Sequence, residues 1–455
     1  MTQLEHYLEH LQRFGIRPGL ERMRALLQTI GNPQAQYPVV LVGGTNGKGS
    51  TCEFLARGLA REGKTVGLYT SPHLYKWNER LRVLDVGVAD QNGFAGTPAD
   101  DELDALFNAL KPQIEAVAAS ENGQPTEFET LTFLGLQHFA LRRVDVAVVE
   151  VGLGGRFDAT NVCEPLVSVV THVALDHCDR LGNTHVEIAR DKVCIARAGC
   201  ILVTSETRDD VLEVFRAHCE QIGARLWSFR DVEYSNDRAA LEEAVFDAEQ
   251  FAPQQEIEFQ QLNARTAHIA RVALSHSDKR FEIDQAARAK SLSSQRDLQT
   301  SQQFQNATQP LIASQSLIAV PGRFQIVRDD PMLILDGANN PEGAQFLASQ
   351  LRRVLDARPN SRLTLVLGIL RDKDYAAMIA LLAPLAHRII ATQSSSPRAC
   401  EAAVIANHAR RFCAHVEEIA SVQAAVERAL TLSTRSDIVC ATGSFYTVAE
   451  IKFEK

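Results

Sequence analysis

The sequence predicts an α/β protein with a parallel, doubly wound sheet in its first domain and a second, smaller α/β domain. Three observations support this fold class. Short β-branched runs alternate with helical patterns in both parts of the chain, as parallel strands joined by crossover helices require. A glycine-rich turn at residues 43–50 joins the first such run to the helical pattern that follows. A polar stretch at 275–316 separates the two series.

The composition is that of an ordinary globular protein. With 455 residues, 45% of them hydrophobic and 23% charged, the chain is long enough for two or three domains. A net charge of −9 argues against general nucleic-acid binding. The nine cysteines include no C-x-x-C pair, so we expect reduced thiols and neither a zinc module nor a disulfide framework. The N-terminus lacks a signal-peptide core and no apolar stretch approaches a membrane span, so we expect a cytoplasmic protein without a membrane partner.

The first series begins with helical periodicity in residues 1–30, which we expect to pack on the first domain. A Gly-, Asp- and Ala-rich stretch at 85–100 is expected to be a loop. The expected strands are 38–42, 64–70, 144–151, 166–173 and 200–204, and the expected helices run from Thr51 to about Arg61 and over 101–120, 128–141 and 184–197.

The second series is typical of a Rossmann-like α/β domain. Its expected strands are 332–335, 363–367, 388–392 and 437–441, with helices between them. We place the domain boundary near Val320, which gives an N-terminal domain of residues 1–319 and a C-terminal domain of residues 320–455. The stretch 275–316, rich in Gln, Ser, Ala, Arg and Asp, is interpreted as a polar insertion or linker.

The glycine-rich turn predicts a phosphate-binding loop. Glycines let the backbone approach phosphates, amide groups at a helix N-terminus point toward them, and a lysine adds a full positive charge. The candidate residues are Thr45, Asn46, Gly47, Lys48, Gly49 and Ser50. The spacing departs from the common P-loop, since Gly43 and Gly47 enclose three residues. The alternative is a glycine turn of another α/β protein.

The source of a hydroxyl ligand for Mg²⁺ is left open by this spacing, because Ser50 stands one place later than usual. Ser71, at the end of the second expected strand, is a second candidate. Glu150 ends the third expected strand, and ligands bind at the carboxyl ends of parallel strands. A carboxylate there suits Mg²⁺, although pairing with Arg156 is an equally good interpretation. His177 follows the fourth strand, where it is either a metal or phosphate neighbour or a structural hydrogen-bonding residue.

Three further polar residues have competing interpretations. Lys192 lies in a helical stretch with Glu187 and Asp191 nearby, which by itself favours a solvated lysine with helical charge partners. Asp336 ends a strand of the second domain, where it either holds a ribose hydroxyl or caps a helix. Arg323, at the start of that domain, is placed to reach phosphates.

Ten motifs in order over nearly the whole chain resemble folylpolyglutamate synthase/dihydrofolate synthase of the Mur-ligase superfamily. They are GTNGKGS, TSPHL, TEFETLT, EVGLGGRFDATN, ALDHCDRLG, IARDK, PGRFQ, DGANNP, GILRDKD and TGSFYTVAE. The resemblance implies a P-loop parallel-sheet ATPase domain followed by a glutamate-ligase domain. It implies that ATP phosphorylates a pterin carboxylate, that the amine of L-glutamate attacks the acyl phosphate, and that ADP and phosphate leave. The implied ligands are ATP, one or two Mg²⁺ ions, a monovalent cation, dihydropteroate, tetrahydrofolate and L-glutamate; we expect a monomer.

The resemblance also implies roles for single residues. Lys48, Glu150, His177 and Lys192 are the implied catalytic residues, with Ser71, Glu150 and His177 as Mg²⁺ ligands and Lys192 carbamylated by CO₂. The implied nucleotide contacts beyond the loop are Asn263, Arg323 and Asp336. The implied dihydropteroate contacts are Thr126, Glu127, Phe128, Glu129, Phe157, Asp158 and Ala159.

Two departures from the family pattern stand out. Asn339 occupies the place of the customary His in DGANNP, and an amide cannot carry a proton or charge near pH 7. The polar stretch before PGRFQ is longer than the family needs. The alternatives to a bifunctional enzyme are a synthase with one of the two activities, a cell-wall ligase acting on a UDP-sugar peptide, and a member that binds folate or nucleotide without ligating.

Overall fold

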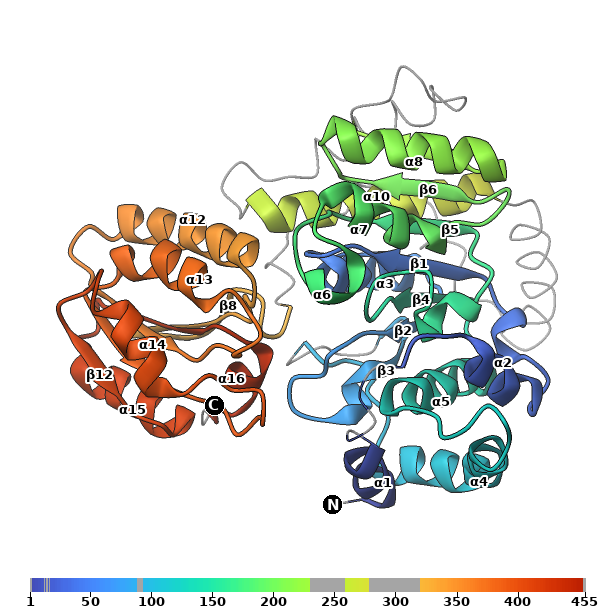
Figure 1. The fold of residues 1–455 in the computed structure, drawn as a ribbon, viewed down its shortest axis with the longest axis horizontal. Coiled ribbons are helices and arrows are strands. Elements are labelled where there is room, and N and C mark those ends of the chain that lie inside the picture. Colours follow the sequence, from blue (N-terminus) through green and yellow to red (C-terminus); the bar gives the residue numbers. More distant parts are fainter. Residues whose placement is uncertain are drawn as a thin grey trace, which may run out of the picture. The chain divides into compact units, whose positions relative to one another are not determined.

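The fold is described from a computed structural model for residues 2–11, 13, 15, 17–87, 93–229, 258–277 and 320–452. The chain divides into two compact units, each described here by itself (Figure 1). The first comprises Met1–His73 and Trp77–Leu317, and the second comprises Leu74–Lys76 and Ile318–Lys455. The insertion expected at 275–316 lies outside the described residues except for 275–277, which end a helix. The boundary expected at residue 320 borders undescribed residues and stays a prediction.

The first unit is built on a seven-stranded sheet in the order β3-β2-β4-β1-β5-β6-β7. Every neighbouring pair is parallel except β2 and β3, so the parallel α/β fold class is confirmed. The strands are β1 (Val39–Gly43), β2 (Val66–Tyr69), β3 (Leu81–Leu84), β4 (Val146–Glu150), β5 (Val167–Val170), β6 (Ile201–Thr204) and β7 (Arg225–Ser228).

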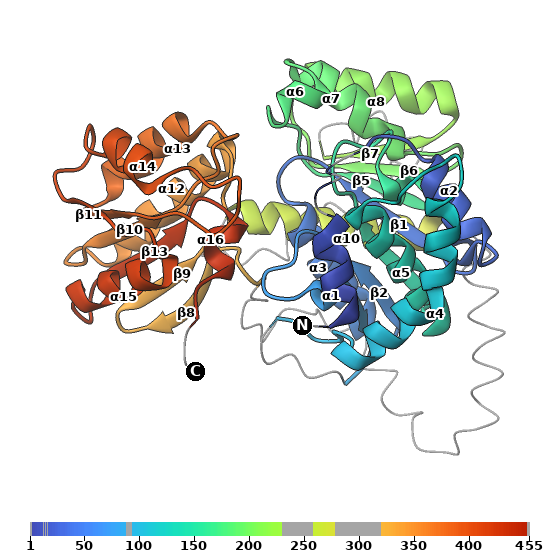
Figure 2. The same ribbon diagram turned by 60° about the horizontal axis from the view of Figure 1, so that its bottom comes forward.

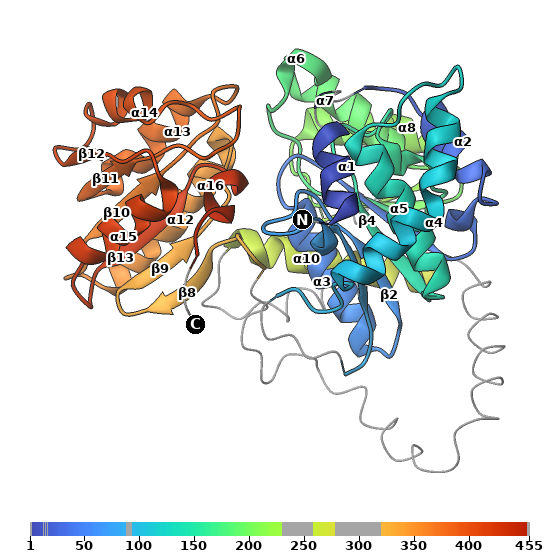
Figure 3. The ribbon, with the colours of Figure 1, turned by 90° about the horizontal axis from the view of Figure 1, so that it is seen from below.

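Helices cover both faces of this sheet and enclose two apolar cores. On β1, Val40 and Val42 point to the face covered by α3 (Lys48–Arg61) and α10 (Glu258–Ser277), which lie side by side in Figures 2 and 3. Val39 and Leu41 point to the opposite core. That core is covered by α1 (Gln3–Leu11), α2 (Glu21–Gln28), α4 (Asp100–Ala118), α5 (Glu127–Leu141), α7 (His185–Lys192) and α8 (Asp209–Ile222).

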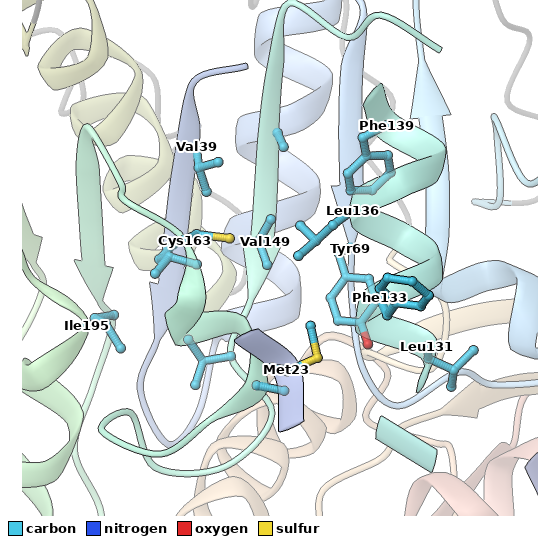
Figure 4. Close-up of a cluster of buried hydrophobic side chains, with 14 of the residues drawn as sticks. Met23, Val39, Tyr69, Leu131, Phe133, Leu136, Phe139, Val149, Cys163 and Ile195 are labelled. Carbon is cyan, nitrogen blue, oxygen red and sulfur yellow. The ribbon is translucent and has the colours of Figure 1, made fainter. Parts of the chain in front are cut away.

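Helix α5 contributes several large side chains to the second core, and Figure 4 shows Phe133, Leu136 and Phe139 among its members. Phe133, Leu136 and Phe139 are each at most 1% exposed and pack with residues of the sheet. Gly67 of β2 allows this close approach, because a Cβ there would lie 2.6 Å from Cγ of Phe139. The helix is apolar on nearly all sides because it is buried between the sheet and the outer helices.

The second unit contains a six-stranded sheet in the order β12-β11-β10-β13-β9-β8, in which β8 and β9 form the antiparallel pair. Its strands are β8 (Gln325–Asp329), β9 (Met332–Leu335), β10 (Leu363–Leu367), β11 (Arg388–Ala391), β12 (Val416–Glu418) and β13 (Ile438–Thr442). In Figure 2, α12 (Pro341–Ala357), α13 (Tyr375–Leu382) and α14 (Ala402–Ala409) lie on one side of the sheet and α15 (Val422–Leu432) on the other. The short α16 (Phe445–Ala449) follows β13.

Several boundaries differ from those that the sequence predicts. Helix α3 begins at Lys48 rather than Thr51, and α7 ends at Lys192, followed by a 3-10 turn at Val193–Ile195. Strands β3, β7, β8 and β12 were not predicted; all four are edge strands of three to five residues, too short for a clear sequence pattern. All nine cysteines are free. Within the described ranges, every helix is too short or too polar to span a bilayer.

Candidate active site

The phosphate loop has the strand, glycine turn and helix order that the sequence predicts. Gly47, at φ +89°, is the N-cap of α3, a backbone conformation that glycine adopts without steric cost. Lys48 is the first residue of the helix, and its Nζ donates to the carbonyl of Thr45 at 3.1 Å. The first N–H groups of a helix have no partner within it, and they carry the positive end of the helix dipole. The turn is therefore suited to anions, and phosphate binding itself stays a prediction.

The segment after β5 holds the phosphate loop in place through hydrogen bonds. The N–H of Thr45 donates to the carbonyl of His172 at 2.6 Å, and Thr171 Oγ1 donates to the carbonyl of Asn46 at 2.8 Å. Gly44, at φ +134°, has no room for a side chain, since a Cβ would overlap Thr171 Oγ1. The position of the loop thus depends on residues more than 100 places away in sequence.

Glu150 lies beside the phosphate loop at the carboxyl edge of the sheet. Strands β1 and β4 are parallel neighbours with Val42 opposite Glu150, so both end at the same edge. The Glu150 side chain is buried, and its Oε2 accepts the N–H of Ser71 at 2.9 Å. A Cβ on Gly49 would lie 3.4 Å from the same oxygen, which places the carboxylate against the first turn of α3.

These donors suit a hard divalent cation. A hydroxyl at Ser71 and a carboxylate at Glu150 are oxygen ligands, and Mg²⁺ takes few ligands from protein because it keeps several waters. Among the described residues, no three His, Cys, Asp or Glu side chains form a metal-binding group. His177 lies on the loop after β5, the other neighbour of β1, at φ +51° and with its N–H bonded to Asp176 Oδ1 at 2.9 Å. The structure brings Ser71 and Glu150 together, and the metal roles of all three stay predictions.

Lys192 is buried, which makes the interpretation as a solvated lysine wrong. It is 4% exposed and its Nζ donates to the carbonyl of Gly44 at 2.8 Å. Burial, together with the positive charge of Lys48, lowers the pKa of Lys192 from 10.5 to about 7. The glycine loop after β4 explains the burial, since a Cβ on Gly155 would lie within 2.9 Å of the Lys192 backbone. The amine is therefore available for chemistry near neutral pH.

The segment 126–129 shapes the start of α5. Thr126 and Glu129 form a capping box, and Glu129 also pairs with Arg22 at 3.0 Å. Glu127 lies 3.3 Å from Nη1 of Arg80, and burial raises the pKa of Glu127. The remaining residue of the segment, Phe128, packs edge-on against the ring of Tyr69, and the two ring centroids are 6.0 Å apart. Thr126 and Glu129 thus have structural roles, and substrate contacts by all four residues stay predictions.

The segment 157–159 combines one exposed and two buried side chains. Phe157 is 54% exposed, whereas Ala159 is part of the core. Asp158 is buried and its Oδ2 accepts the N–H groups of Gly152 and Leu153 at 3.0 and 2.9 Å. Its carboxylate holds the glycine loop in place, so Phe157 is the residue of this segment best placed to contact a substrate.

The predicted nucleotide contacts outside the loop lie in both units. Asn263, on α10 of the first unit, is buried and donates to Gln260 Oε1 at 3.2 Å. In the second unit, the Arg323 guanidinium lies 4.3 Å from the centroid of the Phe445 ring. Their nucleotide contacts stay predictions.

Asp336 organises the loop after β9. Its two carboxylate oxygens accept the N–H groups of Phe324 and Ala338, each at 2.8 Å. The alternative that it caps a helix is wrong, because the N-cap of α12 is Asn340, whose side chain accepts from the N–H of Gly343. The nucleotide role of Asp336 also stays a prediction.

Sequence reasoning missed two polar pairs at this edge. Nδ1 of His172, whose carbonyl binds Thr45, lies 3.3 Å from the buried carboxylate of Glu206. Nε of Arg80 donates to Nδ1 of His73 at 3.0 Å, which requires the neutral ring, and burial lowers the pKa of His73 to about 3. The signal that could have pointed to Glu206 was its place two residues after the expected strand 200–204, whose carboxyl end lies at the same edge of the parallel sheet as the phosphate loop.

Comparison with known proteins identifies the family of the chain. The family described as "Mur ligase, glutamate ligase domain" matches residues 322–445. The dihydrofolate synthase/folylpolyglutamate synthase of Bacillus subtilis (strain 168) is 34% identical over 459 residues, covering 97% of this chain and 95% of that protein.

Two solved structures are similar over nearly the whole chain. Folylpolyglutamate synthase of Mycobacterium tuberculosis complexed with ADP is 26% identical with a TM-score of 0.77, covering 98% of this chain and 96% of that one. The bifunctional folylpolyglutamate synthase/dihydrofolate synthase of Yersinia pestis complexed with AMPPNP and a Mn ion is 29% identical with a TM-score of 0.69, covering 98% and 95%. On this identity and coverage, the chain belongs to the dihydrofolate synthase/folylpolyglutamate synthase family of Mur ligases.

Proposed function

We propose that this protein is an ATP-dependent amide ligase that adds L-glutamate to dihydropteroate and to reduced folates. The observation that carries the proposal is the meeting of three groups at one sheet edge: the Lys48 turn, the Glu150 carboxylate and the Lys192 amine. The carbonyl of Gly44, in the phosphate loop, accepts from Lys192, and Gly49, in the first turn of α3, lies against Glu150. Membership of a family whose named members carry both activities supports the same function.

The phosphate loop holds and polarises the triphosphate. Lys48 and the N–H groups at the start of α3 bind the phosphates and stabilise the charge that shifts during transfer. The γ-phosphoryl group passes to the carboxylate of the pterin substrate and gives an acyl phosphate. The free amine of L-glutamate then attacks the acyl carbon, the C–O bond to phosphate breaks, and an amide, phosphate and ADP result.

Ser71, Glu150 and His177 are the proposed Mg²⁺ ligands. The ion supplies charge neutralisation on the nucleotide phosphates. The Glu150 carboxylate is held at the carboxyl edge of the sheet by the N–H of Ser71, which its Oε2 accepts at 2.9 Å. Phe157 and Glu127 are the residues of their segments that we propose to contact dihydropteroate. The side chain of Glu127 is 22% exposed and Phe157 is 54% exposed, whereas the side chain of Glu129 is 4% exposed and Asp158 is buried.

We propose that Lys192 is carbamylated by CO₂. The neutral amine attacks CO₂ and releases one proton, which turns a cationic side chain into a carboxylate. A pKa lowered to about 7 by burial makes the neutral amine abundant at physiological pH. The product places a second negative group beside Lys48 and the phosphate loop, where it orients the metal and substrate.

The proposed function is tested by ADP formation with purified protein, Mg²⁺ and ATP. We expect ADP release to require dihydropteroate and L-glutamate together, with little release when either is omitted. Turnover of a UDP-sugar peptide with none on any pterin would instead favour a cell-wall ligase, and nucleotide binding without ligation would favour a binding protein, in line with Asn339 replacing His.

Bifunctionality is tested with two acceptors in parallel. We expect glutamate addition to both dihydropteroate and tetrahydrofolate, followed by mass spectrometry of the products. Addition to only one of them would assign a single activity. We also propose a monomer in the cytoplasm; gel filtration with light scattering at assay concentration tests the first, and cell fractionation the second.

A further inference from the structure

Glu206 is a buried carboxylate next to the segment that contacts the phosphate loop. The proposed chemistry does not use it. Glu206 follows β6 and is 0% exposed. Its Oε1 accepts the N–H groups of Thr207 and Arg208 at 2.8 and 2.9 Å. Its Oε2 accepts the N–H of Val173 at 3.0 Å and lies 3.3 Å from Nδ1 of His172. Both oxygens are therefore engaged, one with its own strand end and one with the segment after β5.

These contacts keep Glu206 ionised and fixed in orientation. Burial acts to raise its pKa, but the hydrogen bond and charge of His172 and the backbone N–H donors lower it to about 2. Charge-assisted hydrogen bonds are shorter and stronger than neutral ones. Because donors lie on both oxygens, the carboxylate cannot rotate without breaking one set of bonds. Glu206 thus acts as a rigid bridge between two segments that are 33 residues apart.

The segment that Glu206 holds is also the one that carries the phosphate loop. The carbonyl of His172 accepts the N–H of Thr45, and the N–H of Ala174 donates to Thr45 Oγ1 at 3.0 Å. Thr171 Oγ1 donates to the carbonyl of Asn46 at 2.8 Å. With the bond from Thr45 Oγ1 to the carbonyl of Ala174 at 3.3 Å, four hydrogen bonds join residues 171–174 to Thr45 and Asn46. The ring of His172 faces the carboxylate, and its carbonyl faces the loop.

A second, weaker set of hydrogen bonds joins the carboxyl ends of β5 and β6. Ser205 Oγ donates to the carbonyl of Thr171 at 2.6 Å, and Thr204 Oγ1 donates to the carbonyl of Val170 at 2.7 Å. These neutral bonds hold β6 against β5 at the sheet edge. Glu206 differs because it is charged and binds His172, which itself contacts the loop, and Val173, which lies next to it.

We propose that Glu206 is a positioning residue for nucleotide binding, which fixes segment 171–174 through His172 and Val173 and thereby sets the backbone of the phosphate loop. The inference rests on the proposed function, since the loop must bind ATP phosphates for its position to matter. Backbone amides bind phosphate through fixed geometry, so a small displacement of Thr45 weakens several contacts at once.

The decisive variant is Glu206→Gln, which keeps the shape of the side chain. An amide has one acceptor oxygen, so its NH₂ group must face one of the two sets of N–H donors. We expect the Kd for MgATP, measured by calorimetry, to rise about tenfold, the order seen when partners behind a site's ligands are removed. The KM for L-glutamate should stay unchanged, which separates lost nucleotide positioning from a general distortion of the active site.

Asp145→Asn is the matched control. Asp145 precedes β4, at the opposite edge of the same sheet, and its Oδ2 accepts the N–H of Thr65 at 2.8 Å. The Asp145→Asn variant, like Glu206→Gln, loses a charged acceptor for a backbone N–H. Its thermal stability should therefore fall, while its Kd for MgATP should match that of the wild type. Equal weakening of MgATP binding in both variants would overturn the inference.

His172→Ala tests the bridge if Glu206→Gln does not fold. It removes the ring that faces Glu206 and keeps the carbonyl that accepts from Thr45. We expect weaker MgATP binding here too, and a Glu206→Gln/His172→Ala double variant with less than the sum of the two losses, since the residues act as one unit. Wild-type MgATP affinity in His172→Ala and in folded Glu206→Gln would overturn the inference. Failure of the wild type itself to bind MgATP would contradict the proposed function instead.

Discussion

Lys192 is expected to react reversibly with CO₂ near neutral pH, because its side chain is then largely a free amine. With its pKa lowered from 10.5 to about 7 by burial, the neutral fraction at pH 7 rises from roughly one molecule in 3000 to about one half. Only the neutral amine attacks CO₂, so the share of the reactive form at pH 7 rises by this factor. Raising the pH from about 6 to about 8 moves the neutral fraction from roughly one tenth to nine tenths.

The assay is NMR of the enzyme equilibrated with ¹³C-bicarbonate. Wild type should give a protein-bound carbonyl signal that grows from pH 6 to pH 8, and Lys192→Ala should lack it. Lys64→Ala is the matched control, since Lys64 is a partly buried lysine at the opposite sheet edge whose pKa burial also lowers; it should keep the signal. Ligase activity lost in Lys192→Ala should return in part with small carboxylates. Full activity without any ¹³C signal, or an intact Lys192→Ala fold that short carboxylates do not rescue, would refute the carbamate.

Three further predictions concern the loop and its surroundings. In Lys48→Ala the rate of ATP-dependent ligation should fall by at least about 100-fold with an unchanged fold, because a positive charge at the transferred phosphate is lost. The kinetics of ADP release measure the rate, and circular dichroism checks the fold. A wild-type rate would reject the phosphate role of Lys48. Gly49→Ala should keep or gain stability, by up to about 1 kcal/mol of helix propensity, yet lose Mg²⁺-dependent ATP affinity, since its methyl would lie 3.4 Å from the Glu150 carboxylate; thermal melts and calorimetry test both halves, and unchanged affinity would count against Glu150 as a metal ligand. Arg82→Ala should cost about 2 kcal/mol of unfolding free energy, because it removes charged hydrogen bonds to the buried carboxylate of Glu53 and leaves that carboxylate paired with Arg57; urea denaturation measures it, and a loss below about 0.5 kcal/mol would contradict the contribution of this pair.

The strand, glycine turn and helix of the phosphate loop were predictable because they are contiguous. Apolar period and glycine spacing around Lys48 specify that unit locally. The place of Glu150 was also predictable, since the ends of parallel strands share an edge. The ends of helices were less predictable. Helix α3 starts at Lys48, three residues before the predicted start, because its N-cap is Gly47 and its first turn contains Gly49, and the periodic pattern includes neither glycine.

Burial of charged residues was not predictable from local pattern. Lys192 sits among charged neighbours in sequence, but the Gly154–Gly155 backbone packs against its helix and removes it from solvent. Glu206 was missed for the same reason: the partners that tie it to the segment after β5 are the His172 ring and the N–H of Val173, more than 30 residues away in sequence. Such contacts are a property of the tertiary fold and leave no periodic signal.

The segment 126–129 shows that one sequence pattern is consistent with two different roles. Thr126 and Glu129, three residues apart before an apolar run, form the sequence signature of a capping box. The family resemblance gave the same residues a substrate role. The structure shows the capping role directly, and leaves Glu127, with its carboxylate near Arg80, as the polar residue of the segment whose binding role is most worth testing.

The central claim is that Lys48 and Glu150 share one magnesium nucleotide at the carboxyl edge of the sheet. The most direct measurement is calorimetric titration of ATP, with and without Mg²⁺, into wild type, Lys48→Ala and Glu150→Gln. We predict that Mg²⁺ strengthens ATP binding to the wild type, that Lys48→Ala weakens binding in both conditions, and that Glu150→Gln removes most of the Mg²⁺ effect alone. The same strengthening by Mg²⁺ in Glu150→Gln as in the wild type would contradict the account.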